Sequence, residues 1–401
     1  MTTQLPAHTR LSASGAKKFI HCSGSVALEA EGPFPEDVDD ESEWSREGTA
    51  AHDLGYTCLR SGEEPWMRIG EKFNGIEVTD DMSVAVQTYT DYIRQLHADM
   101  PYLKGFAETR VDDPTFHPDF GGTSDYYAYS TKTPDEGNPW LVVVDYKHGV
   151  GVPVSVDHNE QGMYYAYGII RKLTIPNKAL VRIVIVQPRV PFGEPVQEWT
   201  TTAGEIREWA LKTLLPAMKR VDSGDTSLVP GDWCQFCPRR LRCPMLNADL
   251  DELIAVADNV PGLSKSTKTV DMDNERMSRL LEKIPAVRFL LTALKRDGER
   301  RLLAGETIHG QKLVNELGDR VWKPEAKAQL EASFGLEAYT VPEIKSPAAI
   351  EKLPGGKDIV AKLAYKPQKG LTMAPATDKR QPQKPPTGET IFNVDKLTSD
   401  E

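Results

Sequence analysis

The apolar positions of this chain change their spacing along its length, and each spacing predicts a different kind of element. In the N-terminal part they recur every three to four residues, which is the period of a helix. They do so over residues 11–30, 46–61 and 80–99. Residues 31–45 are acidic and contain two prolines, so they should form a loop. We therefore predict a helical N-terminal part, whose first helix Ser12 or Ser14 would cap.

Strand-like patterns follow these helices. We predict strands at residues 105–112, 121–130 and 140–147, the last of which ends the apolar run Leu141-Val-Val-Val with Asp145. Turn-forming residues fill 131–139, so the second and third strands should pair as an antiparallel hairpin.

The segments after the hairpin alternate between helix and strand. The pattern predicts helices at 157–172 and 202–222, and a strand at 179–187 between them. Helices, a strand, a hairpin, a helix, a strand and a helix thus follow one another. This order is typical of an α/β core in which helices flank a small mixed sheet.

The chain divides into three regions by this pattern. Residues 1–247 would form the α/β core together with a cysteine cluster. Residues 248–365 would be mostly helical, with a long charged helix at 273–304 and short strands near 308–315. Residues 366–401 are rich in Pro and Lys, and we expect them to be disordered because they offer few apolar side chains to bury.

Composition limits the class of protein. The 401 residues are 39% hydrophobic and 27% charged, which is ordinary for a soluble globular chain. The sequence has neither an apolar run of about 20 residues nor a signal-peptide core, so we expect a cytoplasmic protein without a membrane partner. The net charge of −11 argues mildly against nucleic-acid binding. Charge is unevenly spread, however, since residues 31–47 are acidic whereas residues 238–242 read Pro-Arg-Arg-Leu-Arg.

Carboxylates converge at the predicted hairpin. Asp145 and Lys147 lie two positions apart at a strand end, so their side chains share one face. Asp125 lies on the partner strand, where it can face Asp145. Two carboxylates at one point would repel unless a cation joined them, and oxygen ligands suit Mg²⁺ or Mn²⁺. Lys147 could then stabilise charge that develops on a phosphate. A lone Asp-x-Lys is more often a solvated strand end.

Three further residues could complete such a site. His52 follows the small residues Gly48, Ala50 and Ala51 on a predicted helix, and a neutral imidazole binds Mn²⁺ readily. Gln161 and Tyr165 are four residues apart and so share one helical face. Taken singly, His52 is more typical of a core or surface position, and the Gln161/Tyr165 pair of a helix surface.

The cysteines form the most specific pattern. Cys234, Cys237 and Cys243 follow the spacing Cys-x2-Cys-x5-Cys, and a cytosolic chain favours metal binding over disulfides. Three thiolates need a fourth ligand, for which Cys22 and Cys58 are the candidates. Four thiolates serve either zinc or an iron–sulfur cluster. Zinc sites usually use two local cysteine pairs, so three clustered cysteines with one distant partner favour a 4Fe–4S cluster.

These residues, in this order, resemble the RecB-like branch of the PD-(D/E)xK nuclease superfamily, and more narrowly its iron–sulfur exonucleases. The resemblance covers residues 11 to about 247. It rests on Cys22, Gly48 to His52, Gly122 to Asp125, Asp145 to Lys147, Gln161 to Tyr165, and the cysteine triplet. The chain departs from the pattern at Cys22, which is followed by Ser23 where relatives often have Pro. Cys58 therefore stays an alternative to Cys22 as the fourth cysteine ligand.

The resemblance implies roles for individual residues. His52, Asp125 and Asp145 would hold the metal ion with the Tyr146 carbonyl, and Lys147 would be catalytic together with Gln161 and Tyr165. Cys22, Cys234, Cys237 and Cys243 would hold a 4Fe–4S cluster. Glu108, on the strand before the hairpin, could join the acidic pocket as in relatives.

The resemblance further implies a restriction-endonuclease-like core and a Mg²⁺- or Mn²⁺-dependent DNA exonuclease. Residues 310–316 and Arg320-Val-Trp are similar to a domain common in bacteriophage genomes, which favours phage DNA recombination or processing in the host cytoplasm. A single-strand annealing or other recombination protein would then be a partner. The alternatives are a structure-specific endonuclease, a non-catalytic DNA-binding or scaffold protein, and a zinc-stabilised accessory factor.

Overall fold

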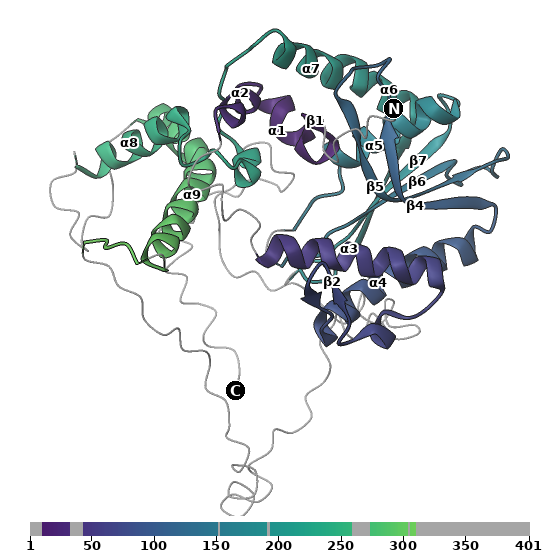
Figure 1. The fold of residues 1–401 in the computed structure, drawn as a ribbon. Helices are drawn as coiled ribbons and strands as arrows, with labels where there is room; N and C mark the ends of the chain where they lie inside the picture. The colour runs from purple at the N-terminus through teal and green to yellow at the C-terminus, as the bar shows by residue number, and fades with distance from the viewer. Residues whose placement is uncertain are drawn as a thin grey trace, which may run out of the picture. The chain divides into compact units, whose positions relative to one another are not determined.

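The computed structural model describes residues 10–32, 43–150, 153–190, 193–258, 273–303 and 305–309. The chain divides into two compact units, residues 1–314 and 315–401, and all described residues belong to the first. The described part is an α/β structure in which helices flank a mixed sheet, as the sequence pattern predicts (Figure 1).

One six-stranded sheet forms the centre of this unit. Its strands are β1 (Leu11–Ser12), β4 (Leu103–Asp112), β5 (Phe120–Ser130), β6 (Leu141–Tyr146), β7 (Leu180–Val186) and β8 (Val196–Thr202). The order is β1-β5-β6-β7-β8, with β4 also paired to β5. β5 and β6 form the predicted antiparallel hairpin, with Tyr126 opposite Val144. β6 and β7 run parallel, so the chain crosses over between them through a helix.

Helices cover both faces of the sheet (Figure 1). On one face lie α1 (Ala16–His21), α5 (Glu160–Leu173), α6 (Ala203–Trp209) and α7 (Leu215–Asp222), whose apolar residues share a core with β6 and β7. On the other face lie α3 (Glu43–Ser61) and α4 (Asp80–Asp99). β6 is buried along its whole length because both layers cover it, which explains its unbroken apolar sequence.

Helix α5 lies unusually close to the sheet. A Cβ atom added at Gly162 would lie 2.5 Å from Ile183 Cγ2, and one at Gly168 would lie 2.4 Å from Val111 Cγ1. The Tyr164 hydroxyl accepts a hydrogen bond from Gly121 N at 2.7 Å and donates one to the Leu11 carbonyl at 2.8 Å. These contacts fix α5 against β5 and β1, and so fix the helix that carries Gln161 and Tyr165.

The N-terminal segment differs from the single helix predicted over residues 11–30. It begins as β1, continues through a 3₁₀ turn (Ala13–Gly15), and then forms α1 and α2 (Gly24–Ala30) with a break between them. Cys22 leaves the helical conformation at φ −139° and ψ 78°, and its carbonyl accepts a hydrogen bond from the Ser25 hydroxyl at 2.6 Å. Neither Ser12 nor Ser14 caps a helix through its side chain: Ser12 precedes the 3₁₀ turn, Ser14 lies within it, and Gly15 holds the N-cap position of α1.

Several elements were absent from the sequence prediction. β2 (Lys72–Phe73) and β3 (Ile76–Glu77) form a hairpin whose turn, Asn74-Gly75, has positive φ at both residues. The Asn-Gly pair is a turn signal that could have revealed it. β8 pairs antiparallel with β7, and the β-branched and aromatic residues of Val196–Thr202 were the available signal.

The C-terminal part of this unit is helical. α8 (Pro244–Asp258) was not predicted and crosses position 247, where the expected core ends, whereas α9 (Asn274–Leu303) matches the predicted long helix. Leu246 of α8 and Leu290 of α9 share a small apolar cluster with Cys234 and Cys243. The strands expected near 308–315, the helices beyond them and the tail at 366–401 lie outside the described residues, except for 308 and 309. Within the described ranges, no helix has the length and apolarity needed to cross a membrane.

Candidate metal centre and cysteine site

The end of β6 directs Asp145 and Lys147 to the same layer of the fold. Leu141 and Val143 point toward α5, whereas Val142 and Val144 point toward α3 and α4. Asp145 and Lys147 continue the first series, as alternation in a strand requires. Lys147 Nζ lies 2.8 Å from Asp145 Oδ2 and donates a hydrogen bond to Gln161 Oε1 at 2.9 Å. The predicted pairing of carboxylate and ammonium is therefore present, and α5 supplies its third member.

Asp125 joins this pair across the hairpin. Its Oδ2 accepts a hydrogen bond of 2.7 Å from the backbone N–H of Tyr146, which lies between Asp145 and Lys147. Its Oδ1 faces His52 of α3, whose Nδ1 lies 3.5 Å away. The same His52 nitrogen lies 3.8 Å from Glu108 Oε1 on β4. His52, Glu108 and Asp125 each place a ligand atom within 4.8 Å of the others.

Glu108 has an unusual backbone in the middle of β4. Its φ is +42°, a left-handed conformation that L-residues with a Cβ avoid. The ladder between β4 and β5 pairs Ala107 with Tyr126 and Thr109 with Ser124, but skips the position where Glu108 would face Asp125. Strain of this kind costs about 1–3 kcal/mol and is concentrated at functional sites. We interpret it as the cost of bringing two carboxylates to one point.

This strain predicts that Glu108→Gly will be more stable than Glu108→Ala. Both changes remove the carboxylate, but only glycine adopts a positive φ without steric cost, so chemical unfolding in EDTA should favour the glycine variant by about 1 kcal/mol. Both variants should bind Mn²⁺ more weakly than the unaltered protein, as measured by calorimetry. Equal stability of the two variants would contradict the left-handed conformation at this position.

The charges of the centre act on one another strongly. Burial raises the pKa of Asp125, although His52 and Lys147 oppose this effect. Burial likewise raises the pKa of Asp145 against the opposing effect of Lys147. Burial would lower the pKa of His52, but Asp125, Glu108 and Asp145 outweigh it and raise that pKa to about 9. In the same way, the Asp145 and Asp125 charges overcome burial and raise the pKa of Lys147.

The donor set fits a hard divalent cation. Among the described residues, the buried Asp145 Oδ2 receives no well-aligned hydrogen bond. Its nearest positive charge is the ammonium of Lys147 at 2.8 Å, and His52 adds a weaker attraction. Carboxylate oxygens with one imidazole suit Mg²⁺ or Mn²⁺. Such an ion would have to displace the proton of His52, so its affinity would rise with pH. The resemblance suggested Glu108 only as an additional member of the acidic pocket. In the structure its carboxylate lies 3.8 Å from His52 Nδ1, so it belongs to the same group of potential ligands.

Gln161 and Tyr165 meet the centre from α5. Gln161 contacts Lys147 directly, whereas Tyr165 is buried against β5: a Cβ atom added at Gly122 would lie 3.0 Å from Tyr165 Cε1. Burial raises the pKa of Tyr165 far above its usual value, and the charges of Asp125 and Asp145 add to this effect, so its hydroxyl stays protonated. The Tyr146 carbonyl stays a predicted ligand, while the Tyr146 ring packs edge-on to His52 at 5.3 Å between centroids.

A second polar cluster beside the centre was not predicted. The buried His148 has its Nδ1 2.8 Å from the Tyr146 hydroxyl and its Nε2 2.6 Å from Arg189 Nη1. Arg189 Nη1 also donates to Glu47 Oε1 at 2.8 Å. Burial and the Arg189 charge lower the pKa of His148, so the ring is neutral and accepts from Arg189. These residues hold the Tyr146 ring, on which His52 packs.

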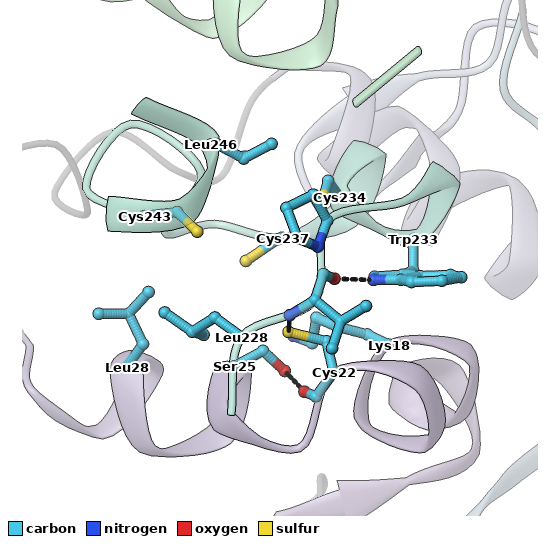
Figure 2. A pocket seen from close by; sticks show the side chains of 12 residues that line it. Lys18, Cys22, Ser25, Leu28, Leu228, Trp233, Cys234, Cys237, Cys243 and Leu246 are labelled. Atoms are coloured by element: carbon cyan, nitrogen blue, oxygen red, sulfur yellow. Dashed lines mark hydrogen bonds between the residues drawn. The ribbon is translucent and has the colours of Figure 1, made fainter. Parts of the chain in front are cut away.

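The four expected cysteine ligands line one small cavity. Cys22 comes from the break between α1 and α2, and Cys234, Cys237 and Cys243 come from the segment that ends at α8. Figure 2 shows Cys22, Cys237 and Cys243 around this cavity, which Leu28, Leu228 and Leu246 also line. Cys58 lies elsewhere, in the core between α3 and α4. The structure thus brings Cys22, rather than Cys58, to the triplet.

The surroundings of the cysteines suit a bound metal group. Val229 N lies 3.4 Å from Cys22 Sγ, and Gly231 N lies 3.4 Å from Cys234 Sγ, so backbone N–H groups donate to two of the sulfurs. Burial raises the pKa of Cys22 and raises that of Cys234 to about 11. Cys22 and Cys234 therefore stay protonated in this cavity unless a metal replaces their protons. All four cysteines are free of disulfides.

The arginines of residues 238–242 brace the cysteine loop. Arg239 is buried and lies 3.4 Å from the Glu29 carbonyl, and Arg240 donates to the carbonyls of Gln235 and Cys237 at 3.0 Å. Gly24 closes the other side: it donates to the Ser227 carbonyl at 2.9 Å, and a Cβ added to it would lie 2.4 Å from the Thr226 carbonyl oxygen. The N-terminal segment is thereby held against the residues that precede the triplet.

Most of this chain matches a known protein family. The match covers residues 8–381 and so includes both the metal centre and the cysteine site. The chain therefore belongs to the family described as "Protein of unknown function (DUF2800)".

Proposed function

We propose that this protein is a Mg²⁺- or Mn²⁺-dependent DNA exonuclease of the RecB-like PD-(D/E)xK type, with a 4Fe–4S cluster on its cysteines. The observation that carries the proposal is the convergence of Asp125, Asp145 and Lys147 with His52 and Gln161. These residues come from two strands and from helices on opposite faces of the sheet. A solvated strand end would not gather them.

The roles follow from the positions. His52, Asp125 and Asp145, with Glu108 beside them, would hold the divalent cation. When bound, this cation would polarise a phosphoryl oxygen and lower the pKa of a bound water. Lys147 keeps its proton, because neighbouring carboxylates raise its pKa, and its ammonium can stabilise charge that develops on the phosphate. Gln161 and Asp145 orient that ammonium. The buried Tyr165 packs against Gly122 of β5 and would keep α5 in place beside the site.

The cysteine site would contribute by closing the fold rather than by chemistry. Its ligands come from residue 22 and residues 234–243, which flank the whole core in sequence. A cluster there would tie the two ends of the core together. We further propose phage DNA recombination or processing as the setting, with DNA as substrate and a recombination protein as partner.

The test is degradation of end-labelled linear and covalently closed circular DNA by protein purified without oxygen. We expect Mn²⁺- or Mg²⁺-dependent loss of linear DNA, no loss of circles, and no activity in EDTA. Cutting of circles would replace the exonuclease with an endonuclease that uses the same site. Binding of DNA without cleavage, in protein that carries its cluster, would replace the enzyme with a scaffold.

A further inference from the structure

His21 connects the cysteine site to the helix that carries Gln161. It is the last residue of α1 and directly precedes Cys22. Its ring stacks on the indole of Trp233, with 4.5 Å between centroids and 10° between planes. Trp233 directly precedes Cys234. One stacked pair thus joins the two chain segments that supply the cysteines.

The indole is tied to the cysteine site a second time through Val229. Trp233 Nε1 donates to the Val229 carbonyl at 2.7 Å, and Val229 N lies 3.4 Å from Cys22 Sγ (Figure 2). Trp233 itself lines the cavity between the cysteines. The indole is therefore part of the wall of this cavity.

On its other side, His21 reaches the start of α5. Its Nε2 lies 3.1 Å from Glu160 Oε1, and Glu160 is the first residue of that helix. The next residue, Gln161, accepts the hydrogen bond from Lys147 Nζ. Only two contacts between side chains, His21 with Glu160 and Gln161 with Lys147, thus separate the cysteine site from the ammonium of the metal centre.

We propose that His21 is a positioning residue through which the occupied cysteine site holds the first turn of α5, and with it Gln161 and Lys147. The connection rests on the proposed metal group in the cysteine site, and its consequence for catalysis rests in addition on the proposed nuclease activity. The 3₁₀ turn Asp232–Phe236 contains Trp233 and one cysteine, and a bound metal group would order it. Without that group, the turn and Trp233 lose their anchor, and His21 loses the surface on which it stacks.

Amide hydrogen exchange measures this connection without reference to activity. The first turn of α5 includes Met163, whose N–H donates to the Asn159 carbonyl at 2.9 Å. We expect peptides covering residues 157–165 to exchange several-fold faster after the cysteine site is emptied by oxidation and EDTA than after anaerobic loading with iron and sulfide.

Two variants separate the contacts of His21. His21→Phe keeps a ring on Trp233 but cannot donate to Glu160, whereas His21→Gln can donate but does not stack as a ring. His21→Phe should show fast exchange in this turn even when loaded, with no further change on emptying. His21→Gln lacks the ring that stacks on Trp233, so it should also show fast exchange when loaded, and both variants should keep the visible absorbance of the unaltered protein.

Activity provides the second readout. The loaded His21→Phe protein should cleave DNA about 10- to 100-fold more slowly at saturating DNA, with KM unchanged, because small displacements of a catalytic group have effects of this size. His158→Phe is the matched control, since His158 lies in the loop before α5 and its ring contacts that of Trp199 on β8, with 4.6 Å between centroids.

The connection is wrong if emptying the cysteine site leaves exchange in the unaltered protein unchanged, or speeds it equally in His21→Phe. Should exchange behave as expected while no preparation degrades DNA, the connection stands and the nuclease proposal fails. Should the unaltered protein and His21→Phe degrade DNA at the same rate, His21 has no positioning role in catalysis.

Discussion

Lys147→Met is expected to abolish metal-dependent DNA degradation, with a loss of at least about 100- to 1000-fold in rate. Lys147 is the cation closest to Asp145, at 2.8 Å, and its ammonium is the group that would meet a developing phosphate charge. Methionine keeps the length and apolar stem of lysine but offers no proton and no charge. The measurement is the initial rate on linear DNA in Mn²⁺, with protein of equal iron content.

The same variant tests the electrostatics of the centre. Without Lys147, the buried Asp145 loses its nearest cation while Asp125 still faces it. The metal-free variant should therefore unfold at lower denaturant concentration than the unaltered protein, and Mn²⁺ should restore much of the difference, because it supplies the missing charge.

Lys172→Met is the matched control, because Lys172 is exposed on α5. It should cleave DNA at the normal rate. Normal cleavage by Lys147→Met would remove Lys147 from the mechanism and, with it, the main support for the nuclease proposal.

Cys22→Ala is expected to lose bound iron and the visible absorbance of the protein, and to unfold more readily. Cys22 lines the cavity with the triplet, and the metal group would close a loop of about 210 residues between Cys22 and Cys234. Opening a loop of this length costs up to about 5 kcal/mol in the chain-entropy treatment of cross-links. Iron and sulfide content, absorbance and chemical unfolding of the full chain are the measurements.

Cys58→Ala provides the matched control, because Cys58 is also fully buried but lies between α3 and α4. It should keep its iron and its colour, and lose only the small stability expected for a shortened core side chain. Loss of iron in Cys58→Ala but not in Cys22→Ala would overturn the ligand set. Stoichiometric zinc in place of iron would retain the ligands but replace the cluster.

Much of the fold follows from local pattern. The strand-like composition of residues 121–130, the buried run of β6 and the turn residues between them predict the hairpin that brings Asp125 to Asp145. The two-residue period places Asp145 and Lys147 on one face. The cysteine spacing predicts a common site for the triplet. These features depend on residues close in sequence, so a single chain reveals them.

The sequence by itself determined the α/β class, the hairpin and the identity of most candidate site residues. Only the tertiary structure decided the conformation of Glu108, the choice of Cys22 over Cys58 as neighbour of the triplet, and the contacts of His148 and His21. Each of these depends on residues from separate elements, such as His21 and Glu160, which are 139 positions apart. Such contacts form only when both helical layers pack on the sheet. The spacing of apolar residues within one element does not determine which side chains from different elements then come into contact.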